Sequence, residues 1–418
     1  MSDQLNGGDL TASMAETRDI IARKEPDIGA WEHLDWDFVD RQVAELENLP
    51  TDQRGPLHGR TVGIKDIFDT ADLPTAYGSE IYTGHQPAAD AACVARLRTA
   101  GAVILGKTVS TEFAYWKAGK TRNPLDRTRS PGGSSSGSVA AVASGMASLA
   151  IGSQTAASTI RPASYCGIVG FKPTRGRISL AGAKALANSL DTVGAFAVSV
   201  ADVGLISSVM MEDGILANIA PLGGPPNIGV HSTPEWDQVD REALAVVTES
   251  AARAEAAGAD VNRQPVPEMF APLAKIQTRV MAYEATRELA HERRVHAVQL
   301  SAPLLELFDL GDSIGAEEHA RELQIRDRCL AELDNLFGQA DIILAPSTLA
   351  EAPLLEDGTG NPDLSRAWTL LGLPSITIPC GTGPEGLPLG LQIAARQGED
   401  ARLLEAARWF EDLLRAGH

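Results

Sequence analysis

The 418-residue sequence has few aromatic side chains and few cysteines. Aromatic residues make up only 5% of the chain, so its interior must be filled mainly by Ala, Val, Leu and Ile. The four cysteines are scattered without any Cys-x-x-Cys pair, at Cys93, Cys166, Cys329 and Cys380. This spacing predicts neither a disulfide framework nor a zinc site, and we expect four solitary thiols in a reducing compartment.

The sequence also lacks a long uninterrupted apolar run. Its most apolar stretch, residues 139–151, is short and contains Ser144, Gly145 and Ser148, so it is not expected to span a bilayer. The first ten residues, MSDQLNGGDL, lack the basic and then apolar layout of a signal peptide. We therefore expect a soluble cytoplasmic protein without membrane contact.

Positive charge is scarce as well. Lys and Arg number 36 against 55 Asp and Glu, which gives a formal net charge of −19. Nucleic acids and anionic membranes bind basic surfaces, so this balance argues against both as partners. Small molecules and proteins remain the expected partners.

Apolar segments of strand length alternate along the chain with amphipathic segments of helical length. Strands are predicted at 61–65, 103–105, 147–152, 168–171, 228–230, 260–266, 341–345, 375–379 and 389–393. Helices are predicted over the first fifty residues, where Trp31 and Leu34 would pack, and at 89–100, 138–145, 240–257, 267–337 and 399–415. This alternation predicts an α/β layered fold with a largely buried sheet.

The length alone suggests two or three domains at ~150 residues each. The best linker candidate is GGPP at 223–226, but strands are predicted on both sides of it. We therefore expect one domain over residues 1–418. Its expected parts are N-terminal helices (1–59), a core (about 60–200), a helical insertion (225–340) and C-terminal strands with a helix that complete the sheet (341–418).

Two short motifs match known patterns in the wrong context. Residues 101–108 read GAVILGKT and match the phosphate-binding pattern GxxxxGK[ST], but the four middle residues are strand-like and a helix precedes them. Residues 133–137 read GSSSG and match the GxSxG nucleophile elbow, which needs an apolar strand running into it. Polar residues 120–129 stand there instead, so we disfavour both interpretations.

Lys65 and two segments of small residues are the remaining candidates for a functional site. Lys65 lies in VGIKD at 62–66, where a strand would place its ammonium among apolar neighbours. A buried lysine is rare unless it is paired or functional, and desolvation lowers its pKa toward that of a general base. The two segments are 130–138 and 152–162; a Ser/Gly run alone could be a flexible linker.

Five separated blocks occur in a defined order along the chain. They are GIKD (63–66), SPGGSSSGS (130–138), GSQTAASTIRP (152–162), YCGIVGFKPT (165–174) and a C-terminal block of LGLPSITIPC (371–380) and GLPLGLQ (386–392). With these blocks, residues 15–415 resemble the amidase signature family of serine amidohydrolases. The resemblance implies an α/β/α layered fold, with a large mixed central β-sheet covered by helices on both faces.

The resemblance further implies a Ser–cis-Ser–Lys triad. In it Ser158 is the nucleophile, Ser134 follows a cis peptide and bridges, and Lys65 is the base. A serine hydroxyl is inert until a neighbour takes its proton, and a neutral lysine can do so through a second hydroxyl and then protonate the leaving amine. The implied reaction cleaves an amide C–N bond through an acyl-enzyme and releases ammonia or an amine and a carboxylic acid.

Backbone N–H groups of Thr155, Ala156, Ala157 and Ser158 are expected to bind the carbonyl oxygen as it becomes negative. The family commonly has two glycines where this chain has Ala156 and Ala157. Alanine there costs roughly 1 kcal/mol or more if the backbone needs φ > 0. No metal and no organic cofactor are expected.

Arg161 is the candidate for substrate specificity. The spacing of the blocks looks most like malonamidase-type bacterial amidases, which implies that Arg161 binds a substrate carboxylate, as in malonamate. The alternative is a structural arginine paired with an acidic residue such as Asp191. Gly133 and Ser135 are also expected to contact substrate.

Several alternatives stay open. The chain could hydrolyse biuret or a carbamate, or it could be a partner-dependent or non-catalytic amidase-like subunit, like those of tRNA-dependent amidotransferases. We expect a small-molecule amide substrate and a homodimer. Tyr77, Tyr115 and Trp116 are expected in the core rather than at a site entrance.

Overall fold

The computed structural model describes residues 10–219 and 222–415, which are built around one 11-stranded mixed sheet. The strand order is β1-β3-β2-β4-β6-β5-β10-β11-β9-β7-β8. The strands are β1 (Trp31–Leu34), β2 (Thr61–Lys65), β3 (Val103–Thr108), β4 (Leu149–Gln154), β5 (Val169–Lys172), β6 (Thr192–Ala197), β7 (Ile228–Ser232), β8 (Val261–Pro265), β9 (Ile342–Pro346), β10 (Ser375–Thr382) and β11 (Pro388–Ala394). Strand β2 runs parallel to β3 and β4, whereas β4, β6, β5, β10, β11 and β9 are successively antiparallel.

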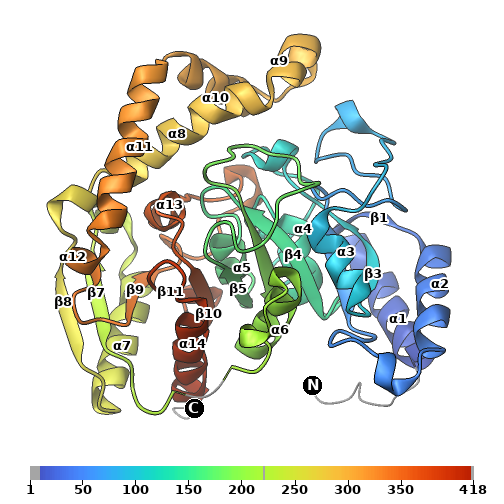
Figure 1. Ribbon diagram of the computed structural model, residues 1–418, viewed down its shortest axis with the longest axis horizontal. Coiled ribbons are helices and arrows are strands. Elements are labelled where there is room, and N and C mark those ends of the chain that lie inside the picture. The colour runs from blue at the N-terminus through green and yellow to red at the C-terminus, as the bar shows by residue number, and fades with distance from the viewer. Residues whose placement is uncertain (1–9, 220–221, 416–418) are drawn as a thin grey trace.

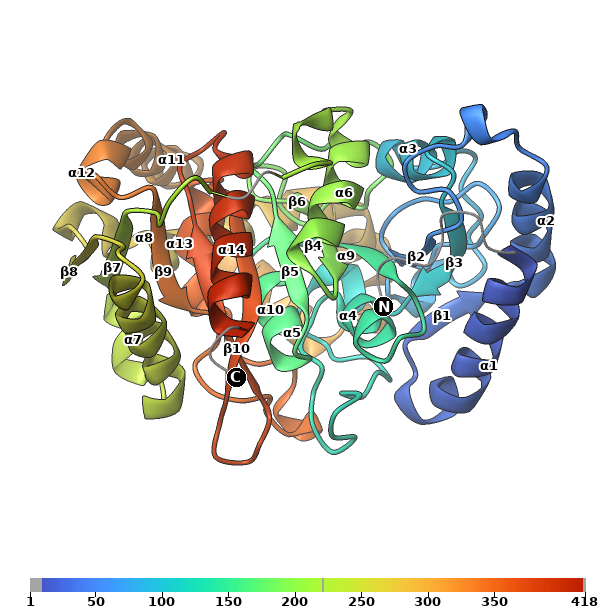
Figure 2. The same ribbon diagram turned by 90° about the horizontal axis from the view of Figure 1, so that it is seen from below.

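Helices connect these strands and cover the sheet (Figures 1 and 2). They are α1 (Leu10–Ile28), α2 (Trp36–Glu47), α3 (Ala92–Thr99), α4 (Ser136–Ala143), α5 (Ile160–Tyr165), α6 (Val200–Met211), α7 (Arg241–Ala256), α8 (Leu273–Glu288), α9 (Ala290–His296), α10 (Ala302–Asp312), α11 (Ala316–Ala331), α12 (Leu333–Phe337), α13 (Asp363–Leu370) and α14 (Asp400–Arg415). None of the described helices is long and apolar enough to cross a membrane.

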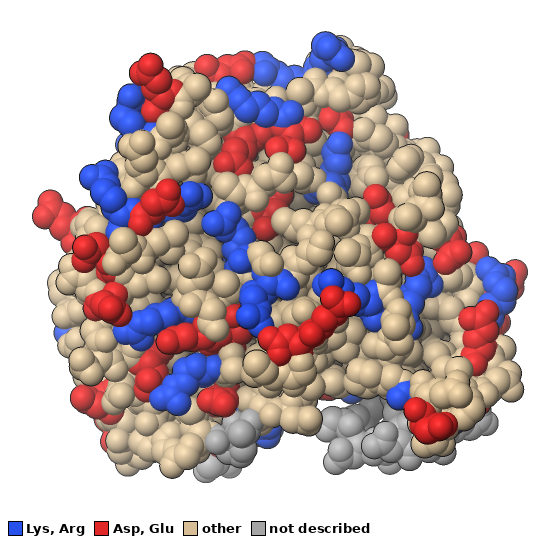
Figure 3. Space-filling view, in the orientation of Figure 1, with Lys and Arg blue, Asp and Glu red and all other residues tan. Residues whose placement is uncertain are grey.

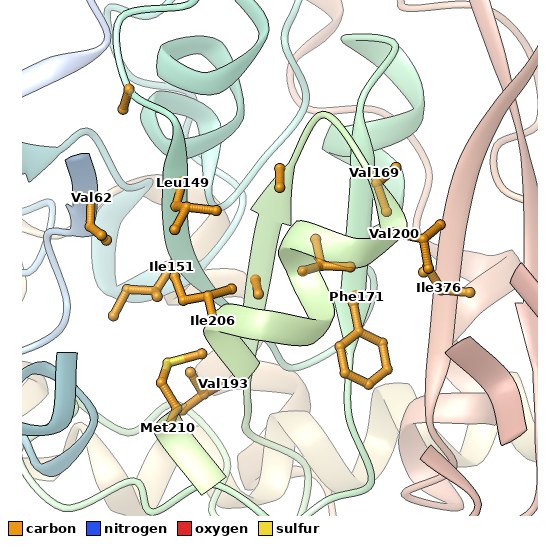
Figure 4. Close-up of a cluster of buried hydrophobic side chains, with 14 of the residues drawn as sticks. Val62, Leu149, Ile151, Val169, Phe171, Val193, Val200, Ile206, Met210 and Ile376 are labelled. Atoms are coloured by element: carbon orange, nitrogen blue, oxygen red, sulfur yellow. The ribbon is translucent and has the colours of Figure 1, made fainter. Parts of the chain in front are cut away.

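Alternating side chains of the central strands pack into different clusters on the two faces of the sheet. On β4, Ile151 belongs to the large apolar cluster with Ile206 of α6, while its neighbour Ala150 packs with residues of α4 and α5. Strand β6 alternates in the same way between Val193 and Phe196. Figure 4 shows the α6 side of this core. Helices therefore cover both faces, which confirms the predicted α/β/α fold.

Helices α8, α9, α10 and α11 project together above the sheet in Figure 1. They belong to the 225–340 segment, which was expected to be a helical insertion. The same segment also supplies β7 and β8, which extend one edge of the sheet beyond β9. This part of the chain is therefore integral to the sheet as well as adding helices to it.

Two strands lie outside the predicted pattern. Residues 31–34 were expected to be helical, but they form β1, which pairs antiparallel with β3 at the edge of the sheet. The Glu25 carboxylate accepts hydrogen bonds from the backbone N–H of Ala30 and Trp31 and so fixes the turn after α1. Strand β6, at the centre of the sheet, was not predicted.

Candidate active site

Lys65 ends strand β2 and is fully buried. Its Nζ lies 2.7 Å from the Ser134 hydroxyl and 2.8 Å from the Ser153 hydroxyl. Burial lowers the pKa of Lys65 to about 7, and the Asp191 carboxylate opposes this shift. The neutral amine is therefore accessible near neutral pH, as a general base requires.

Ser134 and Ser158 reach one pocket from different segments. Ser134 lies just before α4, after a cis Gly133–Ser134 peptide bond, as the resemblance implies. Ser158 lies between β4 and α5. Both serines line a pocket of about 380 Å³ including its open mouth, at the small end for ligand sites. The three predicted triad residues are thus gathered at one place.

The segment from Thr155 to Ser158 forms one wall of this pocket. The N–H groups of Ala156, Ala157 and Ser158 donate to no residue in the described parts of the chain. Gln154 fixes the end of the segment, because its Oε1 accepts hydrogen bonds from the N–H of Thr159 and Ile160. Free donors on a fixed backbone are what an oxyanion site needs.

The backbone of Ala156 and Ala157 does not adopt the left-handed conformation, so the alanine pair carries no such strain. The conformational cost expected for alanine at a position with φ > 0 therefore does not arise at Ala156 or Ala157. Asp191 supports the same segment by accepting a hydrogen bond from the Thr155 hydroxyl at 2.5 Å.

Arg161 is buried beside the nucleophile and lines the pocket. It does not pair with Asp191, so that expectation is wrong. Its Nη2 donates to the Gly133 carbonyl at 2.7 Å and its Nη1 to the Gly360 carbonyl at 2.5 Å. Asp191 instead accepts from Thr155 and from the backbone N–H of residues 186 and 187. Backbone carbonyls of Gly133 and Gly360, rather than a carboxylate, therefore hold Arg161.

Gly133 and Ser135 lie behind the pocket wall. The Gly133 carbonyl is occupied by Arg161. The Ser135 side chain is fully buried, and its hydroxyl lies 3.4 Å from both the N and the O of Ser153. Contact of either residue with substrate stays a prediction.

Arg366, Tyr115 and Trp116 also line the pocket. Arg366 comes from α13; its Nε donates to Asp363 at 2.7 Å and its Nη1 to the amide oxygen of Gln277. Tyr115 and Trp116 were expected in the core. This is wrong for Trp116, which is exposed, whereas Tyr115 is partly buried and packs against the core cluster that contains Tyr77. Sequence spacing does not reveal Arg366, because it lies just before the C-terminal block and far from the serines.

The pocket is more basic than the molecule as a whole. Among the described residues that line it there are two arginines, Arg161 and Arg366, and neither an aspartate nor a glutamate. On the molecular face in Figure 3, acidic and basic side chains are interspersed instead. Within the described ranges, no group of three or more His, Cys, Asp or Glu could hold a metal ion.

The phosphate-binding pattern is excluded by the structure. Residues 103–108 form strand β3, not a loop. Lys107 points into the interior, where its Nζ donates to the Phe68 carbonyl at 2.7 Å and to the Thr75 hydroxyl at 2.5 Å, 3.3 Å from Asp66. It is a satisfied structural lysine. The elbow pattern fails too, since residues 120–129 form no strand.

A family model described as Amidase matches residues 14–404. The chain belongs to the amidase family. Among similar proteins, a glutamyl-tRNA(Gln) amidotransferase subunit of Koribacter versatilis is 32% identical over 95% of this chain and 93% of its own length. A crystal structure of an amidase superposes with a TM-score of 0.88 at 29% identity, covering 97% of this chain and 96% of that one.

The peptide amidase of Stenotrophomonas maltophilia superposes with a TM-score of 0.84 at 30% identity, over 98% of this chain and 94% of that one. These comparisons confirm the family predicted from the five blocks. The particular likeness to malonamidase-type enzymes stays a prediction.

Proposed function

We propose that this amidase is a serine amidohydrolase that cleaves the C–N bond of a small amide through an acyl-enzyme. Neutral Lys65 takes a proton from the Ser134 hydroxyl, which takes one from Ser158 as the Ser158 oxygen attacks the carbonyl carbon. The C–N bond breaks as the proton returns to the leaving nitrogen. Water then attacks the ester by the same proton path and releases the carboxylic acid.

The observation that carries this proposal is the 2.7 Å hydrogen bond between buried Lys65 and Ser134, which lines the pocket together with Ser158. This bond supplies the step of the proton path between Lys65 and Ser134, and burial lowers the pKa of Lys65 to about 7, which makes the lysine a base at neutral pH. The free N–H groups of Ala156, Ala157 and Ser158 would stabilise the oxyanion.

The pocket composition favours an amide that carries an anionic group, with malonamate as one candidate. Arg366 offers a guanidinium Nη2 that has no hydrogen-bond partner in the described chain, and no carboxylate lines the pocket. Arg161 is less suited to this task, because both its Nη atoms already hold backbone carbonyls. Biuret- or carbamate-type substrates keep the same chemistry and remain alternatives.

A partner-dependent subunit is the second candidate function. The observation that favours it is the similarity, at about 30% identity, to proteins named as subunits of glutamyl-tRNA(Gln) amidotransferases. The small, arginine-lined pocket favours hydrolysis of a free small molecule by the chain itself.

Ammonia release tests the proposed function directly. We expect the wild-type amidase to hydrolyse succinamate faster than butyramide, which has the same carbon chain without the carboxylate. Ser158→Ala should abolish both activities, and Lys65→Ala should lower both by at least a hundredfold, because proton transfer by a positioned side chain is worth about 10²–10⁴-fold. Ser232→Ala, at an exposed strand end, is the matched control. Undiminished turnover in Ser158→Ala would contradict the assignment.

A further inference from the structure

Gln277 links Arg366 to the backbone of the oxyanion segment. It lies on α8 and is fully buried. Its Nε2 donates to the Thr155 carbonyl at 2.7 Å, and its Oε1 accepts from Nη1 of Arg366. A guanidinium can only donate and a carbonyl can only accept, so a glutamine amide satisfies both partners in one orientation.

The Thr155 carbonyl sets the direction of the next N–H. In a trans peptide the C=O and the following N–H point to opposite sides, so a Thr155 carbonyl held toward Gln277 turns the Ala156 N–H away from it. That N–H is one of the three free donors on the pocket wall. The position of Gln277 therefore bears on the geometry of oxyanion binding.

The following peptide is held separately. The Thr369 hydroxyl, on α13, lies 2.7 Å from the Ala156 carbonyl and accepts a hydrogen bond from Gln154 at 2.9 Å. Thr369 contacts neither Arg366 nor Gln277 through a hydrogen bond in the described chain. It offers an internal comparison for Gln277.

We propose that Gln277 is a positioning residue that couples Arg366 to the oxyanion segment, so that an anionic substrate group on Arg366 also steadies the Ala156 N–H. This inference rests on the proposed function. Arg366 thereby has two roles. Its Nη2 binds the anionic group, and its Nη1 keeps the Gln277 amide in the orientation that holds the Thr155 carbonyl.

The coupling predicts an effect on a substrate that Arg366 cannot contact by charge. Loss of Arg366 leaves the buried Gln277 oxygen without its donor, and an unpaired buried polar group reorganises or destabilises its surroundings. Arg366→Met should therefore lower kcat for neutral butyramide at least fivefold, in addition to raising KM for succinamate. An arginine that only binds anions would leave butyramide hydrolysis unchanged.

Steady-state kinetics with both amides form the test, together with the rate at which a fluorophosphonate labels Ser158. We expect Gln277→Glu, which loses the donor to Thr155, to lower kcat and the labelling rate at least tenfold with little change in KM. Gln277→Met should lower kcat and the labelling rate in the same way, and it replaces Gln277→Glu in the test if the glutamate variant does not fold. Gln324→Glu, exposed on α11, controls for the added charge.

Double variants separate coupling from general damage. Arg366→Met combined with Gln277→Met should be no worse toward butyramide than Gln277→Met alone, whereas Arg366→Met combined with Thr369→Val should be additive. Wild-type labelling rates in the Gln277 variants, or additive effects of Arg366 and Gln277, would overturn the inference. If Ser158→Ala stayed active, the proposed function itself would fail instead, and the two failures are thus distinguishable.

Discussion

At the level of single residues, the burial of Lys65 and the charge of Asp191 determine the pH at which Lys65 becomes neutral. Burial is the larger influence on Lys65 and lowers its pKa to about 7, while the Asp191 carboxylate favours the charged ammonium and opposes that shift. The reaction needs neutral Lys65, so kcat/KM should rise with pH through about 7 and then level off. Protonation of Lys65 begins the loss of activity on the acid side, and protonation of Asp191, whose pKa is raised by burial to about 6, also contributes to the profile at lower pH.

Replacing Asp191 by Asn tests this electrostatic account. The substitution removes the negative charge that stabilises the Lys65 ammonium, so the pKa of Lys65 falls and the acid limb of the kcat/KM profile moves to lower pH. The profile should be measured with butyramide, which has no titrating group of its own near neutrality. An acid limb that stays in place or moves to higher pH would show that Asp191 does not act on Lys65.

The residues of the site differ in how far sequence reveals them. Lys65, Ser134 and Ser158 lie in blocks of characteristic composition. In the structure both serines line one pocket, and Lys65 lies behind Ser134, 2.7 Å from its hydroxyl. Gln277 and Arg366 have no such signal: Gln277 reaches Thr155 across 122 positions of the sequence. Their roles arise only from the packing of α8 and α13 over the oxyanion segment.

Helix α8 is the element that connects the projecting helices with the site. It carries Gln277, and Met281 one turn later lines the pocket. Helix α10 packs closely on α8 at Gly311, where a Cβ atom would lie 2.2 Å from the Ala282 carbonyl. This approach tolerates no side chain and fixes the position of α8.

Gly311→Ala should therefore push α10 away from α8. We expect a loss of about 1–3 kcal/mol in the free energy of unfolding, the usual cost of overpacking, and a lower kcat because Gln277 and Met281 move with α8. Urea unfolding and ammonia release measure the two effects. Gly214→Ala is the matched control, since a Cβ there meets nothing within 4 Å. Equal stability of both variants would contradict the close approach.

Most elements follow from apolar periodicity, and the exceptions have physical causes. Strand β6 has the sequence TVGAFA. Its Gly194 is required because a Cβ atom there would lie 2.3 Å from the hydroxyl of Thr159, the residue after the nucleophile. A glycine in a strand weakens the local signal. Strand β1 is a four-residue edge strand whose conformation depends on pairing with β3, which local sequence does not contain.

At the scale of the whole molecule, one mixed sheet runs through both halves of the chain. The signature strands β2, β4, β5 and β6 and the later strands β9, β10 and β11 share it. One domain over residues 1–418 stays a prediction that this shared sheet favours. The net charge of the chain is −19, and acidic and basic side chains are interspersed on the face in Figure 3, whereas the pocket is lined by two arginines. A homodimer remains a prediction.

We propose that the chain, without a partner, uses Ser158 as its nucleophile. Labelling of the purified chain with a fluorophosphonate, followed by mapping of the modified peptide by mass spectrometry, identifies the reactive serine. We predict one adduct, on Ser158, that is lost in Ser158→Ala and much reduced in Lys65→Ala. An adduct on Ser135, or no adduct on the folded chain, would exclude Ser158 as the nucleophile.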